Sequence, residues 1–208
     1  MSKFVNLTES EEVACAIKKD DFLKLWEEIE DRPGLDNCLR WLTEETDFFT
    51  APASTKYHGA FPGGLCEHSL AVADALFKLL DVFDPYGDAG IYDDSIILVA
   101  LLHDVCKANF YTETTRRQKD ASGNWTEVRS YMIDDPVPMG HGEKSLYLLL
   151  QTGLKLTDHE AAAIRWHMGA YHDYDQRKTL DQAFQKYPLA LFLHLADMIA
   201  SQYYERES

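Results

Sequence analysis

The sequence predicts an all-α fold that carries one inserted β-hairpin. Apolar residues recur three or four positions apart through most of the 208 residues, which is the spacing of amphipathic helices. Residues 110–133 differ, because two β-prone runs flank an Asn/Gly turn there, and this pattern indicates a hairpin. The sequence shows no internal repeat, low-complexity tract or linker, so we expect a single domain over residues 1–208.

The N-terminal part, residues 1–60, is expected to form helices that pack on the rest of the domain. Residues 11–31 have apolar side chains at helical spacing, and Pro33-Gly34 follows as a helix-ending pair. Residues 35–49 predict a second amphipathic helix. A loop rich in small residues and prolines then leads to the next helix.

The middle and the end of the chain predict the remaining helices. Residues 65–83 have a mainly apolar face, whereas residues 95–105 are apolar on nearly all sides and should form the central, most buried helix. Beyond the hairpin, helices are expected from His141, over residues 157–168 and over residues 187–205. The second of these begins with Thr-x-x-Glu, which is the pattern of a capping box.

The composition narrows the class of protein. The formal charge of −15, from 20 basic and 35 acidic residues, repels a phosphate backbone and disfavours binding to long nucleic acid. No apolar run is long enough to span a membrane and the N-terminus lacks the apolar region of a signal peptide, so we expect a soluble cytoplasmic protein. The four cysteines form no CxxC pair and are interpreted as reduced core thiols: Cys15, Cys38, Cys66 and Cys106.

Several histidines and aspartates occupy inward-facing positions of otherwise apolar helices. His103 and Asp104 end the most apolar helix, although burying such side chains is costly without partners. The others lie on separate segments: His68, His141, His167 and Asp197. Each alone could be a hydrogen-bonded core residue, but one metal centre explains them together, because imidazole and carboxylate are good ligands for Fe, Mn, Zn or Ni. Such a set exceeds the need of one open catalytic ion, so two ions bridged by Asp104 fit better.

These residues resemble the signature of the HD-domain metal-dependent phosphohydrolase superfamily. Its core pattern of His, His-Asp and Asp matches "CEHSLAVA", "LLHDVCK" and "HLADMIA" in this chain, and "GHGEKS" and "IRWHMG" match its two-metal members. The sequence is similar to small bacterial and phage HD hydrolases and to the HD portion of a bacterial three-prime exoribonuclease. That enzyme carries an additional nucleic-acid-binding domain, and none is visible in this sequence.

The resemblance implies an HD-domain helical bundle. Its metal-binding core would span residues 61–205, with residues 110–133 as an insertion that could shape the pocket. It implies one metal with four ligands: His68, His103, Asp104 and Asp197. A second metal would use Asp104, His141 and His167. The implied cofactor is one or two divalent transition-metal ions, Fe, Mn, Zn or Ni, with Mg also possible.

The activity implied by the resemblance is hydrolysis of a phosphate ester by metal-activated water, as a phosphomonoesterase or a phosphodiesterase. The expected substrate is a nucleotide or another small phosphorylated molecule, and the expected catalytic residues are Asp104 and Lys107. Lys107 lies about one helical turn beyond Asp104 and is expected to contact the phosphate, although a lysine at a helix end is often only solvated. Arg165 is a second candidate for substrate binding, with a surface salt bridge as its alternative.

Three other functions fit the same residues. The first is a nuclease or phosphodiesterase on short RNA or DNA, against which the charge of −15 argues. The second is a di-iron oxygenase of the HD type. The third is a binding module that keeps a metal only for stability.

The remaining histidines and one basic cluster leave alternatives open. His194 lies one helical turn before Asp197 and would either orient that carboxylate or pack in the core. Arg116 and Arg117 on the predicted hairpin could contact an anionic substrate or keep an exposed strand in solution. Three histidines are interpreted as loop or surface residues: His58, His159 and His172.

Overall fold

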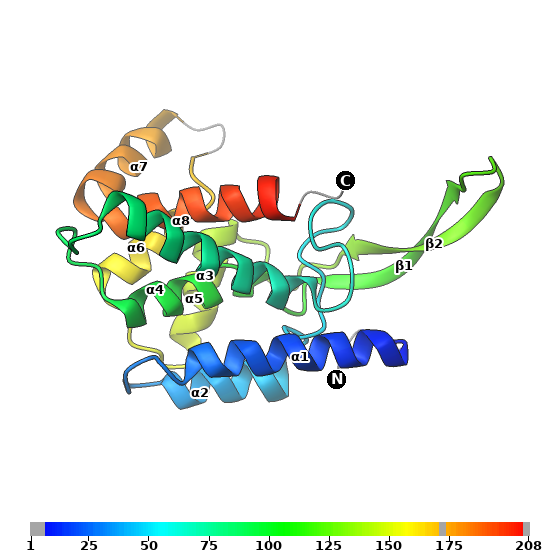
Figure 1. Cartoon of the computed structure of the whole chain (residues 1–208), viewed down its shortest axis with the longest axis horizontal. Helices are drawn as coiled ribbons and strands as arrows, with labels where there is room; N and C mark the ends of the chain where they lie inside the picture. The colour runs from blue at the N-terminus through cyan, green and yellow to red at the C-terminus, as the bar shows by residue number, and fades with distance from the viewer. Residues whose placement is uncertain (1–6, 171–173, 206–208) are drawn as a thin grey trace.

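The computed structural model describes residues 7–170 and 174–205, which form a helical body and a β-hairpin that projects from it (Figure 1). The N-terminal layer consists of three elements: α1 (Glu9–Trp26), α2 (Leu35–Arg40) and a π-helical turn, Trp41–Glu45, that continues α2.

Both predicted N-terminal helices end earlier than the sequence indicates. The first ends at Trp26 rather than at residue 31, and the chain then reverses through Gly34, whose φ of 83° suits glycine. The second ends at Glu45 rather than at residue 49, because Asp47 leaves the helix and accepts a hydrogen bond from the backbone N–H of Asn109 at 2.6 Å.

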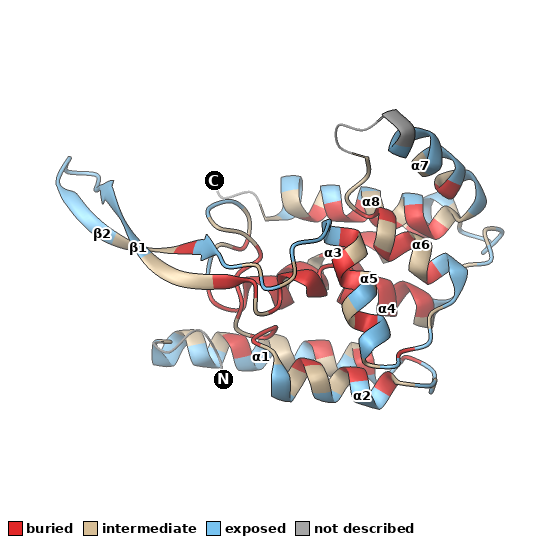
Figure 2. Cartoon of the chain, turned by 180° about the vertical axis from the view of Figure 1, so that it is seen from behind, coloured by how far each residue is buried: buried red, intermediate tan, exposed pale blue. Residues whose placement is uncertain are grey.

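The centre of the body is built from α3 (Gly64–Phe83), α4 (Asp93–Leu102) and α8 (Pro188–Ile199). Every residue of α4 from Ser95 to Leu102 is buried, which confirms the prediction of a central helix. Helix α4 packs against α3 and α6, and α8 packs against the same two helices. Figure 2 shows the buried residues concentrated where these helices meet.

The other helices surround this centre. Helix α5 (His141–Gln151) and helix α6 (Asp158–Trp166) start where predicted, and the capping box between Thr157 and Glu160 is confirmed. Helix α7 (Tyr174–Lys186) was not predicted, because most of its residues are polar and only a short apolar stripe around the buried Ala183 faces the body. Among the described helices, none is long and apolar enough to cross a lipid bilayer.

The predicted hairpin is confirmed. Strands β1 (Tyr111–Lys119) and β2 (Trp125–Ile133) pair antiparallel without a bulge, from Tyr111 opposite Ile133 to Lys119 opposite Trp125. The connecting turn contains Gly123, whose φ of 82° is a left-handed conformation that favours glycine.

Candidate metal centre

Five of the six predicted ligands are buried and converge from four helices. His68 lies in α3, His103 and Asp104 follow the last residue of α4, His167 follows the last residue of α6, and Asp197 lies in α8. The sixth, His141, is the first residue of α5 and is exposed. Three of these ligands follow the ends of α4 and α6, two lie within α3 and α8, and the apolar residues of these helices hold them in place.

His103 and His167 are presented in the same way by two different helices. Each is the C-cap residue of its helix, with φ of −56° and ψ of −35°. In each ring, Nδ1 donates a hydrogen bond to the backbone carbonyl three residues earlier, at 2.8 Å for His103 and 2.7 Å for His167. Carbonyls in the last turn of a helix lack helical partners, so they are available as acceptors. In the neutral form of both residues, Nε2 therefore carries the lone pair.

The ligand atoms of the first predicted metal lie close together. Nε2 of His68 is 3.3 Å from Nε2 of His103 and 3.2 Å from Oδ1 of Asp197. Oδ2 of Asp104 is 3.6 Å from both imidazole Nε2 atoms. Ligand atoms that each lie about 2.1 Å from one ion are roughly 3.0–3.4 Å from each other. The spacing and the mixed imidazole and carboxylate chemistry therefore fit a transition-metal ion.

His68 and His103 differ in their electrostatics. Nδ1 of His68 faces Oε1 of Glu205 at 2.8 Å, and its Nε2 faces Nε2 of His103 at 3.3 Å. Burial lowers the pKa of His68, but hydrogen bonds to Asp197 and Glu205 outweigh burial and raise that pKa to about 9. Burial lowers the pKa of His103 to about 4. A proton on His68 satisfies the facing nitrogens, and a metal ion can take its place.

The ligands of the second predicted metal are near Asp104 but less tightly grouped. Nε2 of His167 is 3.4 Å from Oδ1 of Asp104. His141 forms a different group, with Cys106 and Asp104: Sγ of Cys106 is 3.4 Å from Nδ1 of His141 and 3.8 Å from Oδ1 of Asp104. The structure thus places His141 and His167 beside the Asp104 carboxylate. The Cys106 sulfur is an additional atom there that could ligate a metal ion.

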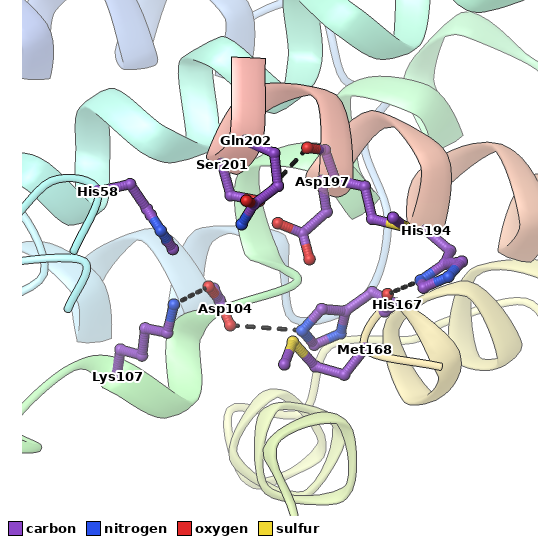
Figure 3. Close-up of a pocket in the computed structure, with 10 residues that line it drawn as sticks. His58, Asp104, Lys107, His167, Met168, His194, Asp197, Ser201 and Gln202 are labelled. Atoms are coloured by element: carbon purple, nitrogen blue, oxygen red, sulfur yellow. Dashed lines mark hydrogen bonds and ion pairs between the residues drawn. The ribbon is translucent and has the colours of Figure 1, made fainter. Parts of the chain in front are cut away.

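Lys107 is buried beside Asp104 and is not a solvated lysine. Its Nζ lies 2.6 Å from Oδ2 of Asp104 (Figure 3). Burial lowers the pKa of Lys107, but the Asp104 carboxylate outweighs burial and raises it. Burial likewise raises the pKa of Asp104, but Lys107 and the neighbouring histidines hold it well below its usual range. Both groups are therefore charged near neutral pH.

A cavity of about 380 Å³ opens onto these groups (Figure 3). Four predicted site residues line it, namely Asp104, Lys107, His167 and Asp197. The remaining lining residues are His58, Met168, His194, Met198, Ser201 and Gln202. A cavity of this volume suits a small molecule, and its lining brings both charged and apolar groups to that molecule.

The structure places two further histidines at the site. His58 lies in a loop, as predicted, but it is half-buried and lines the cavity, with its ring centroid 5.1 Å from that of His68. Nδ1 of His194 donates to the backbone carbonyl of His167 at 2.5 Å, so it fixes the His167 main chain and does not orient the Asp197 carboxylate. His159 is exposed, as predicted, whereas His172 lies outside the described residues.

Arg165 is not brought to the cavity. Its guanidinium pairs with Oε1 of Glu143 at 2.5 Å and stacks 4.1 Å above the ring centroid of Trp166. This is the surface salt bridge that the sequence left as the alternative. The predicted contact between Arg165 and substrate therefore has no support in this arrangement.

Besides His58, two residues of the site were missed at the sequence level. Glu205 contacts Nδ1 of His68, although 137 positions of sequence separate the two residues. The local sequence around Glu205 gives no indication of this contact. Cys106 sits two positions after Asp104, and its apolar surroundings indicated a core thiol. Its proximity to His141 depends on how α5 packs beside the short 3-10 turn Val105–Lys107.

Comparisons with known proteins give one partial relationship. A stretch of 61 residues is 39% identical to dihydroneopterin 2',3'-cyclic phosphate phosphodiesterase of Methanocaldococcus jannaschii. The match covers 29% of this chain and 24% of the archaeal protein. No family model matches the chain. No solved structure matches it either.

Proposed function

We propose that this protein is a metal-dependent phosphohydrolase that cleaves a phosphate ester of a nucleotide or another small phosphorylated substrate. The observation that carries the proposal is the convergence of His68, His103, Asp104 and Asp197, of which Asp104 and Asp197 line a cavity of about 380 Å³. The partial similarity to a phosphodiesterase supports this reaction class and favours a phosphodiester, including a cyclic one, as the substrate.

The proposed first metal site comprises His68, His103, Asp104 and Asp197. The proposed second site comprises Asp104, His141 and His167, with Cys106 adjacent. When bound, divalent transition-metal ions would supply a water of lowered pKa as nucleophile and charge stabilisation at phosphorus.

Asp104 is suited to serve both sites, because its two oxygens face different groups. Oδ2 faces His68, His103 and Lys107, and Oδ1 faces His167. The buried carboxylate stays ionised, so it can hold two cations a short distance apart without changing its protonation state.

Lys107 is suited to hold the phosphate. Its ammonium group has three protons, and the contact with Asp104 engages one of them. The side chain lines the cavity, so its remaining protons can be donated to a phosphoryl oxygen. Because its pKa is raised, Lys107 keeps the positive charge that a developing anion requires.

The proposal is tested by incubating metal-reconstituted protein with a panel of phosphate esters. The panel holds 2',3'-cyclic and 3',5'-cyclic nucleotides, mononucleotides and a short single-stranded oligonucleotide. We expect turnover of at least one small ester, and loss of that turnover in Asp104→Asn. Glu143→Gln, which changes a carboxylate outside the cavity lining, should behave as wild type.

Each other outcome has a defined meaning. Cleavage of the oligonucleotide alone would favour a nuclease, and oxygen consumption without ester cleavage would favour an oxygenase. Fully metal-loaded protein that turns over nothing would contradict the proposal.

A further inference from the structure

The distal half of the hairpin, residues 115–127, extends away from the body (Figures 1 and 2). All of these residues are exposed, including Trp125 at 65%. The base, in contrast, is anchored, because Tyr111 and Tyr131 are buried and Arg129 forms ion pairs with Glu11 and Glu113. None of the described residues that line the cavity belongs to the hairpin. The distal half therefore does not contribute to the cavity, and its function is to be sought elsewhere on the molecule.

The distal half has the properties of a strand pair that is completed by another strand. A two-stranded hairpin is marginally stable by itself, and each of its outer edges offers unpaired backbone N–H and C=O groups. Proteins usually protect such edges with proline, a bulge or charged side chains. Neither β1 nor β2 contains proline or glycine, and their nine residue pairs run without a bulge. The charges on β1 are of both signs, so they can pair with those of a second copy.

We propose that β1 pairs antiparallel with β1 of a second copy of this chain, about a two-fold axis at Thr115. In that register Glu113 of each copy lies opposite Arg117 of the other, and Thr114 lies opposite Arg116. The strand is thus self-complementary in charge, and opposite charges across antiparallel strands are stabilising. Glu113 would then serve two arginines, because one of its carboxylate oxygens also lies 3.4 Å from Nε of Arg129 in its own chain. The pairing joins two hairpins into one four-stranded sheet with an isologous interface.

The surroundings of the hairpin agree with this register. The distal half has three basic residues on β1, Arg116, Arg117 and Lys119, in a chain with 20 basic and 35 acidic residues. The acidic first turn of α1 lies beside the hairpin base, as the ion pair between Glu11 and Arg129 shows (Figure 1). Antiparallel pairing about Thr115 places the basic tip of each copy near this acidic base of the other.

Strand β2 is a weaker candidate for the interface. Its self-complementary register would centre on Val128 and would place Arg129 opposite Glu127 of the second copy. Arg129 already pairs with two carboxylates of its own chain, Glu11 and Glu113, whereas Arg117 on β1 is exposed. The exposed arginines of the hairpin tip lie on β1.

Sedimentation velocity of the full chain and of two charge variants tests the proposal. Wild type should sediment as a dimer whose dissociation constant rises with salt. Arg117→Glu and Glu113→Lys each place like charges in both halves of the interface, so each should weaken the dimer roughly tenfold or more.

Mixing the two variants should restore a dimer. In the mixed pair, Glu113 of the first variant meets Arg117 of the second, and the two introduced side chains, which are opposite in charge, meet each other. The control Arg116→Glu changes a residue that faces Thr114 and should remain dimeric.

One further variant keeps the test valid if a charge change disturbs the hairpin base. Replacing residues 116–128 with Asn-Gly keeps Thr115 opposite Arg129 and removes the rest of the proposed interface. This variant should be monomeric, with an unchanged circular dichroism in the helical region. A monomeric wild type, a dimer that survives the hairpin replacement, or two monomeric variants that do not associate on mixing would each overturn the proposal.

Discussion

The Nε2 atoms of His68 and His103 face each other at 3.3 Å, although 35 positions separate the two residues. Both rings use Nδ1 for other partners, Glu205 for His68 and the Ala100 carbonyl for His103. Two imidazole lone pairs do not remain this close without a cation between them or a proton on one ring. The relationship explains why an apolar helix ends in His-Asp, and it leads to the predictions below.

Removing the Glu205 carboxylate should weaken metal binding. Glu205 fixes the orientation of the His68 ring through Nδ1, and loss of such an outer partner typically lowers metal affinity about 10–100-fold. We expect Glu205→Gln to raise the metal dissociation constant by roughly this factor in calorimetric titrations. Glu143→Gln, which changes only a surface ion pair, should have wild-type affinity. Equal affinities in the two variants would rule out the proposed role of Glu205.

Lys107 should contribute to turnover and not to metal content. We expect Lys107→Met to lower kcat by about 100-fold, because a charged donor is lost at the phosphate while the metal ligands remain. Lys107→Arg should recover part of the rate, since it restores the charge. The measurements are steady-state kinetics and metal analysis of the same samples. If metal content falls in parallel with kcat, Lys107 acts only by holding Asp104.

His58 should affect the use of substrate from its position in the cavity wall. We expect His58→Ala to lower kcat/KM by about tenfold at unchanged metal content, because a polar contact in the cavity is lost. His159→Ala removes an exposed histidine outside this cavity and serves as the matched control. Identical kcat/KM values for both variants would show that His58 does not contact substrate.

Glu160 should make a pH-dependent contribution to stability. It is fully buried and accepts hydrogen bonds from Arg32 and Ser95, each at 2.7 Å. Burial raises the pKa of Glu160, but hydrogen bonds from Thr157, Arg32 and Ser95 outweigh burial and lower it below 4.5. A lowered folded-state pKa gives stability above the unfolded pKa, and this stability is lost as the pH falls through the folded value.

We therefore expect Glu160→Gln to reduce the free energy of unfolding by about 2–4 kcal/mol at neutral pH. The difference from wild type should shrink as the pH falls from the ordinary pKa of a glutamate towards the lowered pKa of Glu160 in the folded protein. Urea unfolding at a series of pH values measures this difference in the free energy of unfolding. A difference that is constant with pH would mean that the carboxylate charge is not the cause.

The sequence predicted best those structural features that a single short segment determines. The hairpin, the capping box at Thr157 and the buried α4 each follow from local pattern. Helix ends were less predictable, because distant partners set them, as Asn109 does for Asp47. Helix α7 was missed because it has few apolar residues, and these form a buried face only where α7 packs against α8.

The residues of the candidate site show the same difference between features set by local sequence and features set by distant contacts. The ordered set of histidines and aspartates could be recognised from residue type and helical context alone. The roles of Glu205, His58 and Cys106 could not, because each depends on a contact between segments that are far apart or on the detailed packing of a short turn. Arg165 shows the opposite case, since a nearby Glu143 on α5 draws it away from the cavity.

Metal content measured by mass spectrometry tests the proposed metal centre most directly. Wild type and Asp104→Ala are stripped of metal, reconstituted with Fe, Mn, Zn or Ni, and desalted in parallel. We predict one or two equivalents of at least one of these metals in wild type and strongly reduced binding in Asp104→Ala, with circular dichroism showing that both are folded. A wild-type protein that retains no metal, or an Asp104→Ala variant that retains as much as wild type, would contradict the metal centre.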